Sequence, residues 1–159
     1  MDERILALWA KLPREPERRT YHPLLCHLID VACVVEALWE LAFTAGVRQS
    51  FAAGLGLPEQ EAARWLAFWA GLHDLGKAFP GFQLREPGSP VERLAAQQVL
   101  AAGFPRGFPT AQPPQHGTVT TCALMSLLVD EFAHPRDLAR TVAFAVGGHH
   151  GAFPDPVDV

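Results

Sequence analysis

His73-Asp74-Leu75-Gly76-Lys77 is the stretch of the sequence on which the assignment of fold and site depends. The residues before it, from Glu59 onward, are apolar on nearly every side of a helix, so we expect a buried helix over 59–75. Gly76 follows as the expected C-terminal glycine of that helix. Adjacent helical residues project about 100° apart, so an imidazole and a carboxylate at this helix end can bind neighbouring metal ions, with the carboxylate bridging them.

The remaining sequence also favours helices, which are separated by turns rich in proline and glycine. No segment alternates convincingly between apolar and polar residues and no internal repeat is present, so we predict an all-α fold in a single domain over residues 1–159. A Gly-rich turn is expected near 54–56, and Ser89, Pro90 and Glu92 form a capping box. The further helices are expected at 2–12, 23–46, 90–102, 118–132 and 135–146.

Five of the seven histidines lie beside apolar helical runs or at helix ends next to glycine, positions that can converge in a helical bundle. They are His27, His73, His116, His149 and His150. A single buried imidazole is more often satisfied by a hydrogen bond than by a metal, but five of them together with Asp74 favour metal binding. The other two, His22 and His134, precede prolines at the expected starts of helices, where we expect a local or capping role.

The composition limits the classes of function. The chain has 49% apolar residues and a net charge of −4, so it has no global attraction to polyanions, and nucleic-acid binding would need a local patch or bound metal. Its most apolar stretch, 24–43, is interrupted by charges and no leader pattern opens the chain, so we expect a cytoplasmic protein without a membrane partner. Cys26, Cys33 and Cys122 form no C-x-x-C pair and are expected to be reduced core residues.

Five short motifs, H-x-x-D, H-D-x-G-K, F-Q, H-G and H-H, follow one another in this order along the chain. They are His27 with Asp30, His73 to Lys77, Phe82-Gln83, His116-Gly117 and His149-His150. Each motif alone is common, but their order and context over residues 22–151 are specific. In this combination the chain resembles the HD nuclease domain of the CRISPR type I helicase-nuclease. The resemblance implies an HD-superfamily helical bundle.

The resemblance also implies a site with two metal ions. His27, His73 and Asp74 would hold one ion, and Asp74 would bridge it to a second. The second would be held by Asp74, His116, His149 and His150. Divalent transition metals are implied, with Mn, Fe, Co and Ni favoured because histidine-rich ligation differs from the all-oxygen sites of Mg and Ca.

Neighbours of these ligands have expected roles of their own. Lys77, one of only two lysines, lies one turn beyond the pair, where its ammonium can contact a phosphate oxygen or the charge that develops in the transition state. The alternative is a solvated lysine past a helix end. Asp30 either orients His27 through a hydrogen bond or is a charge near the start of its helix. Phe82 and Gln83 are expected to pack the loop beside the site.

The function implied by the resemblance is a metal-dependent nuclease that hydrolyses phosphodiester bonds of single-stranded DNA in CRISPR type I interference, an antiviral defence. The implied partners are a superfamily-2 helicase, fused or separate, and an RNA-guided surveillance complex. The chain has no P-loop pattern, so DNA translocation would come from elsewhere. Two alternatives stay open, an HD phosphohydrolase of small nucleotides and an interaction module that has lost its metal.

Two further features bear on the substrate and on the extent of the domain. Arg85, Arg93 and Arg106 could line either a nuclease groove or a nucleotide pocket. The phenylalanines in predicted loops are expected to anchor those loops more than to stack on bases, and they are Phe79, Phe82, Phe104, Phe108 and Phe153. The family completes its first metal site with an aspartate well beyond the H-H pair. This sequence ends a few residues after that pair, so we expect a domain truncated at its C-terminus, with Asp155 and Asp158 as the nearest substitutes.

Overall fold

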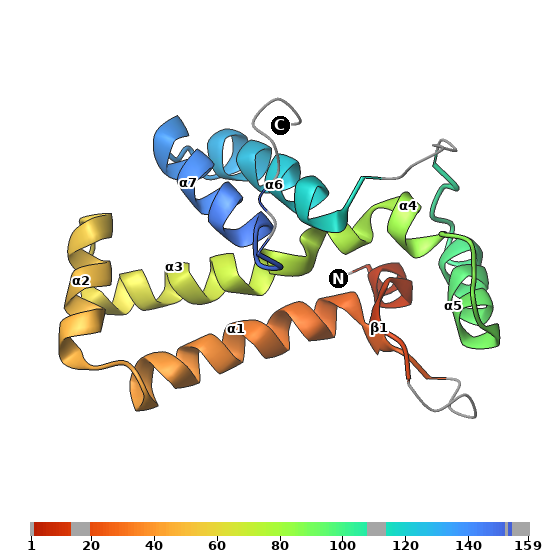
Figure 1. Ribbon diagram of the computed structural model, residues 1–159, viewed down its shortest axis with the longest axis horizontal. Coiled ribbons are helices and arrows are strands. Elements are labelled where there is room, and N and C mark those ends of the chain that lie inside the picture. Colours follow the sequence, from red (N-terminus) through yellow and green to blue (C-terminus); the bar gives the residue numbers. More distant parts are fainter. Residues whose placement is uncertain (1, 14–19, 108–113, 152, 154–159) are drawn as a thin grey trace.

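Two long antiparallel helices, α1 and α3, run side by side along the molecule (Figure 1). The computed structural model describes residues 2–13, 20–107, 114–151 and 153. Helix α1 spans Leu24–Leu41 and α3 spans Glu59–Gly71, so both expected helices are confirmed. A Cβ added at Gly71 would lie 3.1 Å from the carbonyl oxygen of Leu28, which shows how closely the end of α3 approaches α1. This close approach brings the residues after α3 next to the first turns of α1.

Along the chain, helix α2, Ala45–Leu55, follows α1 and precedes α3, where only a Gly-rich turn was expected. The expected extension of α1 to residue 46 is therefore wrong. Thr44 caps α2 by accepting a hydrogen bond from the Val47 amide at 3.4 Å, and Gly56 ends it with a φ of 66°. Ala52 of α2 belongs to a core cluster with Trp39 and Ala62. This cluster joins residues of three separate helices, and a local sequence pattern does not predict such a contact.

A 3-10 helix, η2, continues from the end of α3 and occupies the middle of the molecule. It spans Leu72–Ala78 and is followed by the short helix α4, Pro80–Gln83. The predicted helix over 59–75 is thus wrong in its last turn, and Gly76 is not its terminal glycine. A Cβ at Gly76 would overlap the carbonyl oxygen of His116, so a glycine is required because the chain passes very close here. Helices α1, α3, α6 and α7 all contact η2.

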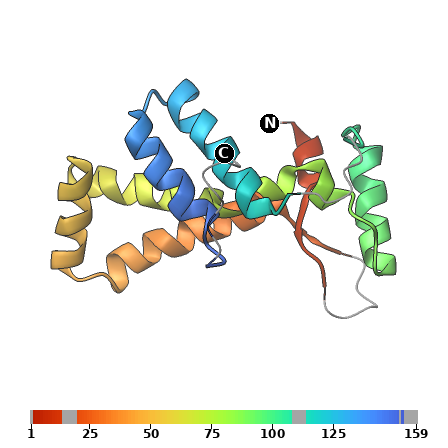
Figure 2. The ribbon, with the colours of Figure 1, turned by 45° about the horizontal axis from the view of Figure 1, so that its top comes forward.

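Helices α6 and α7 pack against each other across η2 (Figure 2). The expected helices in this part of the chain are confirmed as α6, His116–Ser126, its π-helical continuation η3, Leu127–Glu131, and α7, Arg136–Gly147. A Cβ at Gly117 would lie 2.5 Å from the carbonyl oxygen of Gly147, and one at Gly147 would overlap the hydroxyl of Thr121. Small residues therefore let the start of α6 meet the end of α7.

The N-terminal segment forms a 3-10 helix and a hairpin, so the helix expected at 2–12 is wrong. The elements are η1, Glu3–Ala7, and strand β1, Trp9–Lys11, which pairs antiparallel with β2, His22–Pro23. The backbone N–H of Trp9 donates to the side chain of Gln83 at 3.1 Å. Gln83, which is distant in sequence, thus holds the extended conformation at Trp9. The pair β1 and β2 is the one sheet among the described residues.

Helix α5, Pro90–Ala101, begins after Ser89, whose hydroxyl accepts a hydrogen bond from the Glu92 amide at 3.2 Å. The predicted cap is thereby confirmed. Val99 of α5 packs in a core cluster with Trp9 and Leu24. The predicted all-α class is confirmed as a mostly helical fold, and in the ranges given above no helix is long and apolar enough to cross a membrane.

The cysteines do not lie in the core as expected. Cys33 and Cys122 are exposed, and Cys26 is partly buried. Cys33 lies on a face of α1 that also exposes Ile29 and Val34. The apolar pattern of α1 extends beyond the face that packs on α3, which is why burial was wrongly predicted for Cys33.

Candidate metal centre

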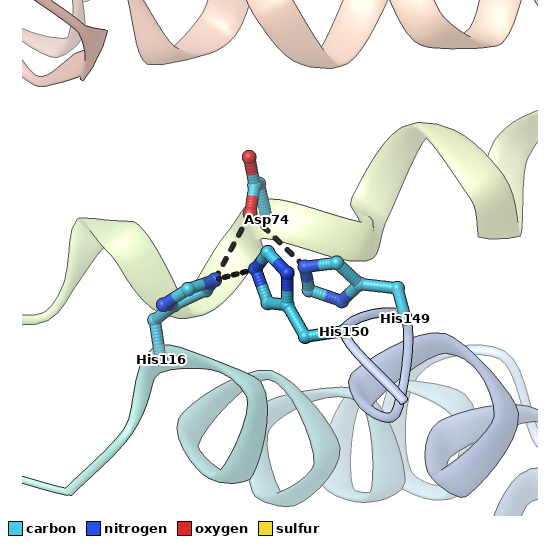
Figure 3. Close-up of side chains that lie close together, drawn as sticks. All are labelled: Asp74, His116, His149 and His150. Atoms are coloured by element: carbon cyan, nitrogen blue, oxygen red, sulfur yellow. Dashed lines mark hydrogen bonds and ion pairs between the residues drawn. The ribbon is translucent and has the colours of Figure 1, made fainter. Parts of the chain in front are cut away.

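The carboxylate of Asp74 is the centre of the site. Asp74 lies in η2 and is only 3% exposed. Its Oδ2 lies 3.0 Å from Nε2 of His27 and 3.3 Å from Nε2 of His73. Its Oδ1 lies 3.3 Å from Nε2 of His116 and 3.5 Å from Nε2 of His149 (Figure 3). Each carboxylate oxygen therefore faces its own pair of histidines.

The histidines come from four separate parts of the chain. His27 lies in the first turn of α1, His73 precedes Asp74 in η2, His116 opens α6, and His149 and His150 follow α7. The side chains form two groups, and within each group the potential ligand atoms lie within 4.8 Å of one another. The groups are His27, His73 and Asp74, and Asp74, His116, His149 and His150. Asp74 is shared by both.

One of the two carboxylate oxygens of Asp74 lacks a hydrogen-bond donor among the described residues. Its Oδ1 is buried and has no hydrogen-bond partner in the part of the chain that the structure describes. A buried carboxylate oxygen without a donor is costly, and a coordinated cation compensates that cost. The Nε2 atoms of His116 and His150 also lie 3.1 Å apart, a separation that one shared cation could span. Both features fit a divalent cation, and the nitrogen-rich donors suit a transition metal.

Backbone carbonyls orient two of the imidazoles toward Asp74. Nδ1 of His73 lies 3.0 Å from the carbonyl oxygen of Ala70, and Nδ1 of His149 lies 2.9 Å from that of Val146. A carbonyl only accepts, so each Nδ1 carries the proton and each Nε2 is left to bind a metal. Such hydrogen bonds are the usual support of metal-binding histidines.

Burial and nearby charges set the protonation of the site. Burial lowers the pKa of His27, His116 and His149 below the ordinary value of an imidazole. Burial acts to raise the pKa of Asp74, but the contacts with His73 and with the charged ammonium of Lys77 outweigh it and hold that pKa well below its usual range. Neutral imidazoles and an ionised carboxylate are the forms that bind metal ions, so the site favours them before any ion arrives.

Thr120 ties η2 to α6, and the sequence analysis missed it. Its hydroxyl accepts a hydrogen bond from the Gly76 amide at 2.9 Å and donates one to the His73 carbonyl at 3.1 Å. Thr120 is fully buried. The only signal in the sequence was its position one turn after His116, because a threonine within a helix otherwise carries no mark of a contact with a distant segment.

Lys77 and Gln83 flank the site. The ammonium of Lys77 donates to Oδ2 of Asp74 at 2.7 Å and its side chain is 13% exposed, so Lys77 is not a solvated lysine. Nε2 of Gln83 donates to the carbonyls of Lys77 at 2.7 Å and Trp9 at 2.9 Å. The expected packing role of Gln83 is confirmed, and Gln83 fixes the backbone at Lys77.

The remaining polar candidates lie outside the two groups. Oδ2 of Asp30 lies 2.9 Å from Nε2 of His22, so the interpretation in which Asp30 orients His27 is wrong. His134 packs its ring 4.7 Å from that of Trp65. Neither His22 nor His134 caps a helix, since the residues before α1 and α7 are prolines, and His134 contacts Trp65 of the distant helix α3.

The structure thus brings all six predicted ligand residues into the two groups, and their roles as ligands stay predictions. Asp155, Asp158 and Phe108 lie outside the described residues. Phe153 is 68% exposed and does not anchor its segment in the core.

Comparison with known proteins gives consistent matches over nearly the whole chain. A family model described as "Cas3, HD domain" matches residues 9–159. The chain is 38% identical over 155 residues to the CRISPR-associated endonuclease/helicase Cas3 of Thermus thermophilus, which covers 97% of this chain and 15% of that protein. The chain therefore spans a small part of this longer relative.

Two solved structures share the fold. A crystal structure of a CRISPR-associated protein is 39% identical with a TM-score of 0.86, and the match covers 98% of this chain and 16% of that one. The Thermus thermophilus cas3 HD domain, solved in the presence of Ni2+, is 33% identical with a TM-score of 0.64. That match covers 96% of this chain and 51% of the other.

Proposed function

The chain belongs to the Cas3 HD-domain family, and on this basis we propose that it hydrolyses phosphodiester bonds of single-stranded DNA with divalent transition metal ions. The Thermus thermophilus relative is named an endonuclease/helicase, which supports a nuclease. The chain matches only part of that relative, but the matched residues include both groups of potential ligand atoms.

One observation carries the proposal. Asp74 turns one carboxylate oxygen toward His27 and His73 and the other toward His116 and His149. A carboxylate in this position is suited to bridge two cations, and paired cations are typical of enzymes that cleave phosphate esters. A mononuclear or purely structural site would not need a bridging carboxylate with histidines on both sides.

The residues have distinct proposed roles. His27, His73 and Asp74 would hold one ion, and Asp74, His116, His149 and His150 would hold the other. Ions bound this way lower the pKa of a water molecule and neutralise the charge of a phosphate. Lys77 already approaches Asp74 at 2.7 Å, and its ammonium can move to a phosphate oxygen of the substrate without leaving the site. The carbonyls of Ala70 and Val146 keep His73 and His149 oriented.

The partners follow from family membership. We propose that the domain acts with a superfamily-2 helicase, fused or separate, which delivers a single strand after an RNA-guided surveillance complex has opened the target in type I interference. The names of the relatives join nuclease and helicase in one protein, which supports a helicase partner. Mn, Fe, Co and Ni are the proposed ions, and the relative solved in the presence of Ni2+ supports a transition metal.

The proposal is tested by incubating metal-free protein with labelled single-stranded DNA, duplex DNA and nucleotides, each with Mn, Co, Ni, Fe, Mg or Zn. We expect cutting of the single strand with a transition metal and its loss in Asp74→Ala. Asp137→Ala is the matched control, because Asp137 is an exposed aspartate in the first turn of α7.

The other outcomes contradict the proposal in different ways. Hydrolysis of nucleotides without cutting of DNA would indicate a small-nucleotide phosphohydrolase. Cutting that survives in Asp74→Ala would place the chemistry elsewhere. Failure to cut any substrate while the chain remains folded would indicate an interaction module.

A further inference from the structure

Arg85 lies in the segment between α4 and α5, and its guanidinium contacts Phe82, whose ring lies near His116 and Lys77. We propose that Arg85 binds a backbone phosphate of the single strand, one that is distinct from the phosphate cleaved at Asp74. This inference rests on the proposed function, because it assigns a substrate-binding position to the same site. It commits to a polynucleotide as the ligand, since a second phosphate is needed.

The guanidinium of Arg85 is held on two sides. Its Cζ lies 4.7 Å from the ring centre of Trp9 and 4.9 Å from that of Phe82. Its Nη2 donates to Oε1 of Glu92 at 2.7 Å, while Oε2 of Glu92 accepts from the Gly88 amide at 2.7 Å. Because Glu92 is fixed by the backbone at the start of α5, the arginine is fixed as well.

Arg85 nevertheless keeps part of its guanidinium open. Its side chain is 40% exposed, whereas that of Glu92 is 17% exposed. Of the five N–H donors of a guanidinium, the described contacts use Nη2, so other donors are available to a ligand. A surface arginine normally loses side-chain entropy when it binds an anion, and a stacked and hydrogen-bonded one has already lost much of it.

Phe82 connects this position to the metal centre. The same ring that contacts Arg85 lies 5.7 Å from the ring of His116 and 5.6 Å from the ammonium of Lys77. Two cations, Lys77 and Arg85, therefore lie around one aromatic ring, and Lys77 also contacts Asp74.

A substrate that contacts both positions must carry more than one phosphate along a chain. Arg85 and His116 both lie near the ring of Phe82, whose centre is 4.9 Å from Cζ of Arg85 and 5.7 Å from the ring centre of His116. A small phosphodiester that reaches Asp74 has no second phosphate for Arg85.

The test compares Arg85→Ala, Arg85→Lys and the control Arg140→Ala. Arg140 also holds its guanidinium over a phenylalanine, 5.7 Å from the ring centre of Phe144, but it lies on α7. Binding of a fluorescent single-stranded oligonucleotide to metal-free protein is measured by anisotropy over a range of salt concentrations, so that no strand is cut. Hydrolysis of bis(4-nitrophenyl) phosphate by the Mn-loaded proteins is measured in parallel.

We expect Arg85→Ala to weaken binding of the oligonucleotide about tenfold, as for loss of one charged hydrogen-bonded contact. The slope of log affinity against log salt should fall by about 0.7, the value for one phosphate contact on a single strand. Arg85→Lys should keep the slope and lose part of the affinity, because it keeps the charge without the planar fork. Arg140→Ala should change neither, and rates with the small phosphodiester should be equal in all four proteins.

Equal affinity and slope in wild-type protein and folded Arg85→Ala would overturn the proposal, as would failure of the wild-type chain to bind any oligonucleotide. Arg85→Lys keeps the test valid if Arg85→Ala does not fold. An altered slope without cutting of DNA would leave the phosphate contact standing and reject the nuclease. Cutting of DNA with an unchanged salt slope would reject the phosphate contact at Arg85 and leave the proposed nuclease standing.

Discussion

The hydroxyl of Thr120 on α6 accepts a hydrogen bond from the backbone amide of Gly76 in η2 at 2.9 Å. The same hydroxyl donates to the carbonyl of His73. This single side chain therefore fixes the turn that carries two proposed ligands to the helix that begins with a third, His116. The geometry of the metal centre depends on this connection, and the first prediction tests it.

Thr120→Val should destabilise the protein by about 1–3 kcal/mol, because it leaves a buried amide and a buried carbonyl without partners. Thr120→Ser keeps the hydroxyl and should cost about 1 kcal/mol for the lost methyl group. Urea unfolding followed by circular dichroism measures both. A valine variant as stable as the serine variant would mean that the two hydrogen bonds do not hold η2 to α6.

Gly76→Ala should be strongly destabilising, since the new Cβ would overlap the carbonyl oxygen of His116 and lie 2.7 Å from the Thr120 amide. We expect a loss of at least about 1–3 kcal/mol together with weaker metal binding, because backbone atoms must move apart. Gly54→Ala is the matched control. Its Cβ would meet nothing within 4 Å, and alanine in a helix is favoured over glycine by about 1 kcal/mol. A Gly76→Ala variant with wild-type melting temperature would contradict the close approach of η2 and α6.

Gln83→Ala should cost at least about 2 kcal/mol, because Gln83 satisfies the backbone of Trp9 and the carbonyl of Lys77. The exposed Gln97 on α5 provides the comparison, and Gln97→Ala should change stability by less than about 0.5 kcal/mol. Thermal unfolding of both variants is sufficient to decide. Equal losses for the two would show that the contacts of Gln83 add nothing to the fold.

Metal-free protein should become less stable as the pH falls from about 7.5 to about 5. Burial lowers the folded pKa of His27, His116 and His149, so the unfolded chain binds more protons than the folded one once the pH falls below about 6.5. Asp74, whose pKa is also lowered, adds a loss in the same direction only below about pH 4. Unfolding midpoints measured across this range would disagree with the assignment if they stayed constant or rose toward acid.

The helices around the site could be predicted from local pattern, and the candidate ligand residues were implied by the family resemblance. Apolar periodicity predicted α1, α6 and α7, although it carried α1 to residue 46 and so missed its end at Leu41. The resemblance carried by the motifs around His27, Asp74 and His116 implied the candidate ligands, and the structure brings these residues together in two groups. Local pattern is sufficient where one helix determines its own limits and where a motif is a short run of adjacent residues.

Contacts between distant segments could not be predicted in the same way. The strand at Trp9 depends on Gln83, and the burial of Thr120 depends on Gly76. Gly76 was interpreted as the end of a helix, although its missing Cβ permits a close approach to α6. A glycine without a Cβ can end a helix or let two segments approach closely, and the sequence alone does not show which of the two applies.

The central claim is that Asp74 is the shared ligand of two metal ions. Isothermal titration of Mn2+ into metal-free protein, compared between wild type and Asp74→Asn, tests it most directly, because the amide keeps the shape of the side chain and removes its charge. We predict that Asp74→Asn weakens every binding event seen in the wild type, while exposed Asp137→Asn leaves them unchanged. Wild-type affinity and stoichiometry in folded Asp74→Asn would contradict the claim.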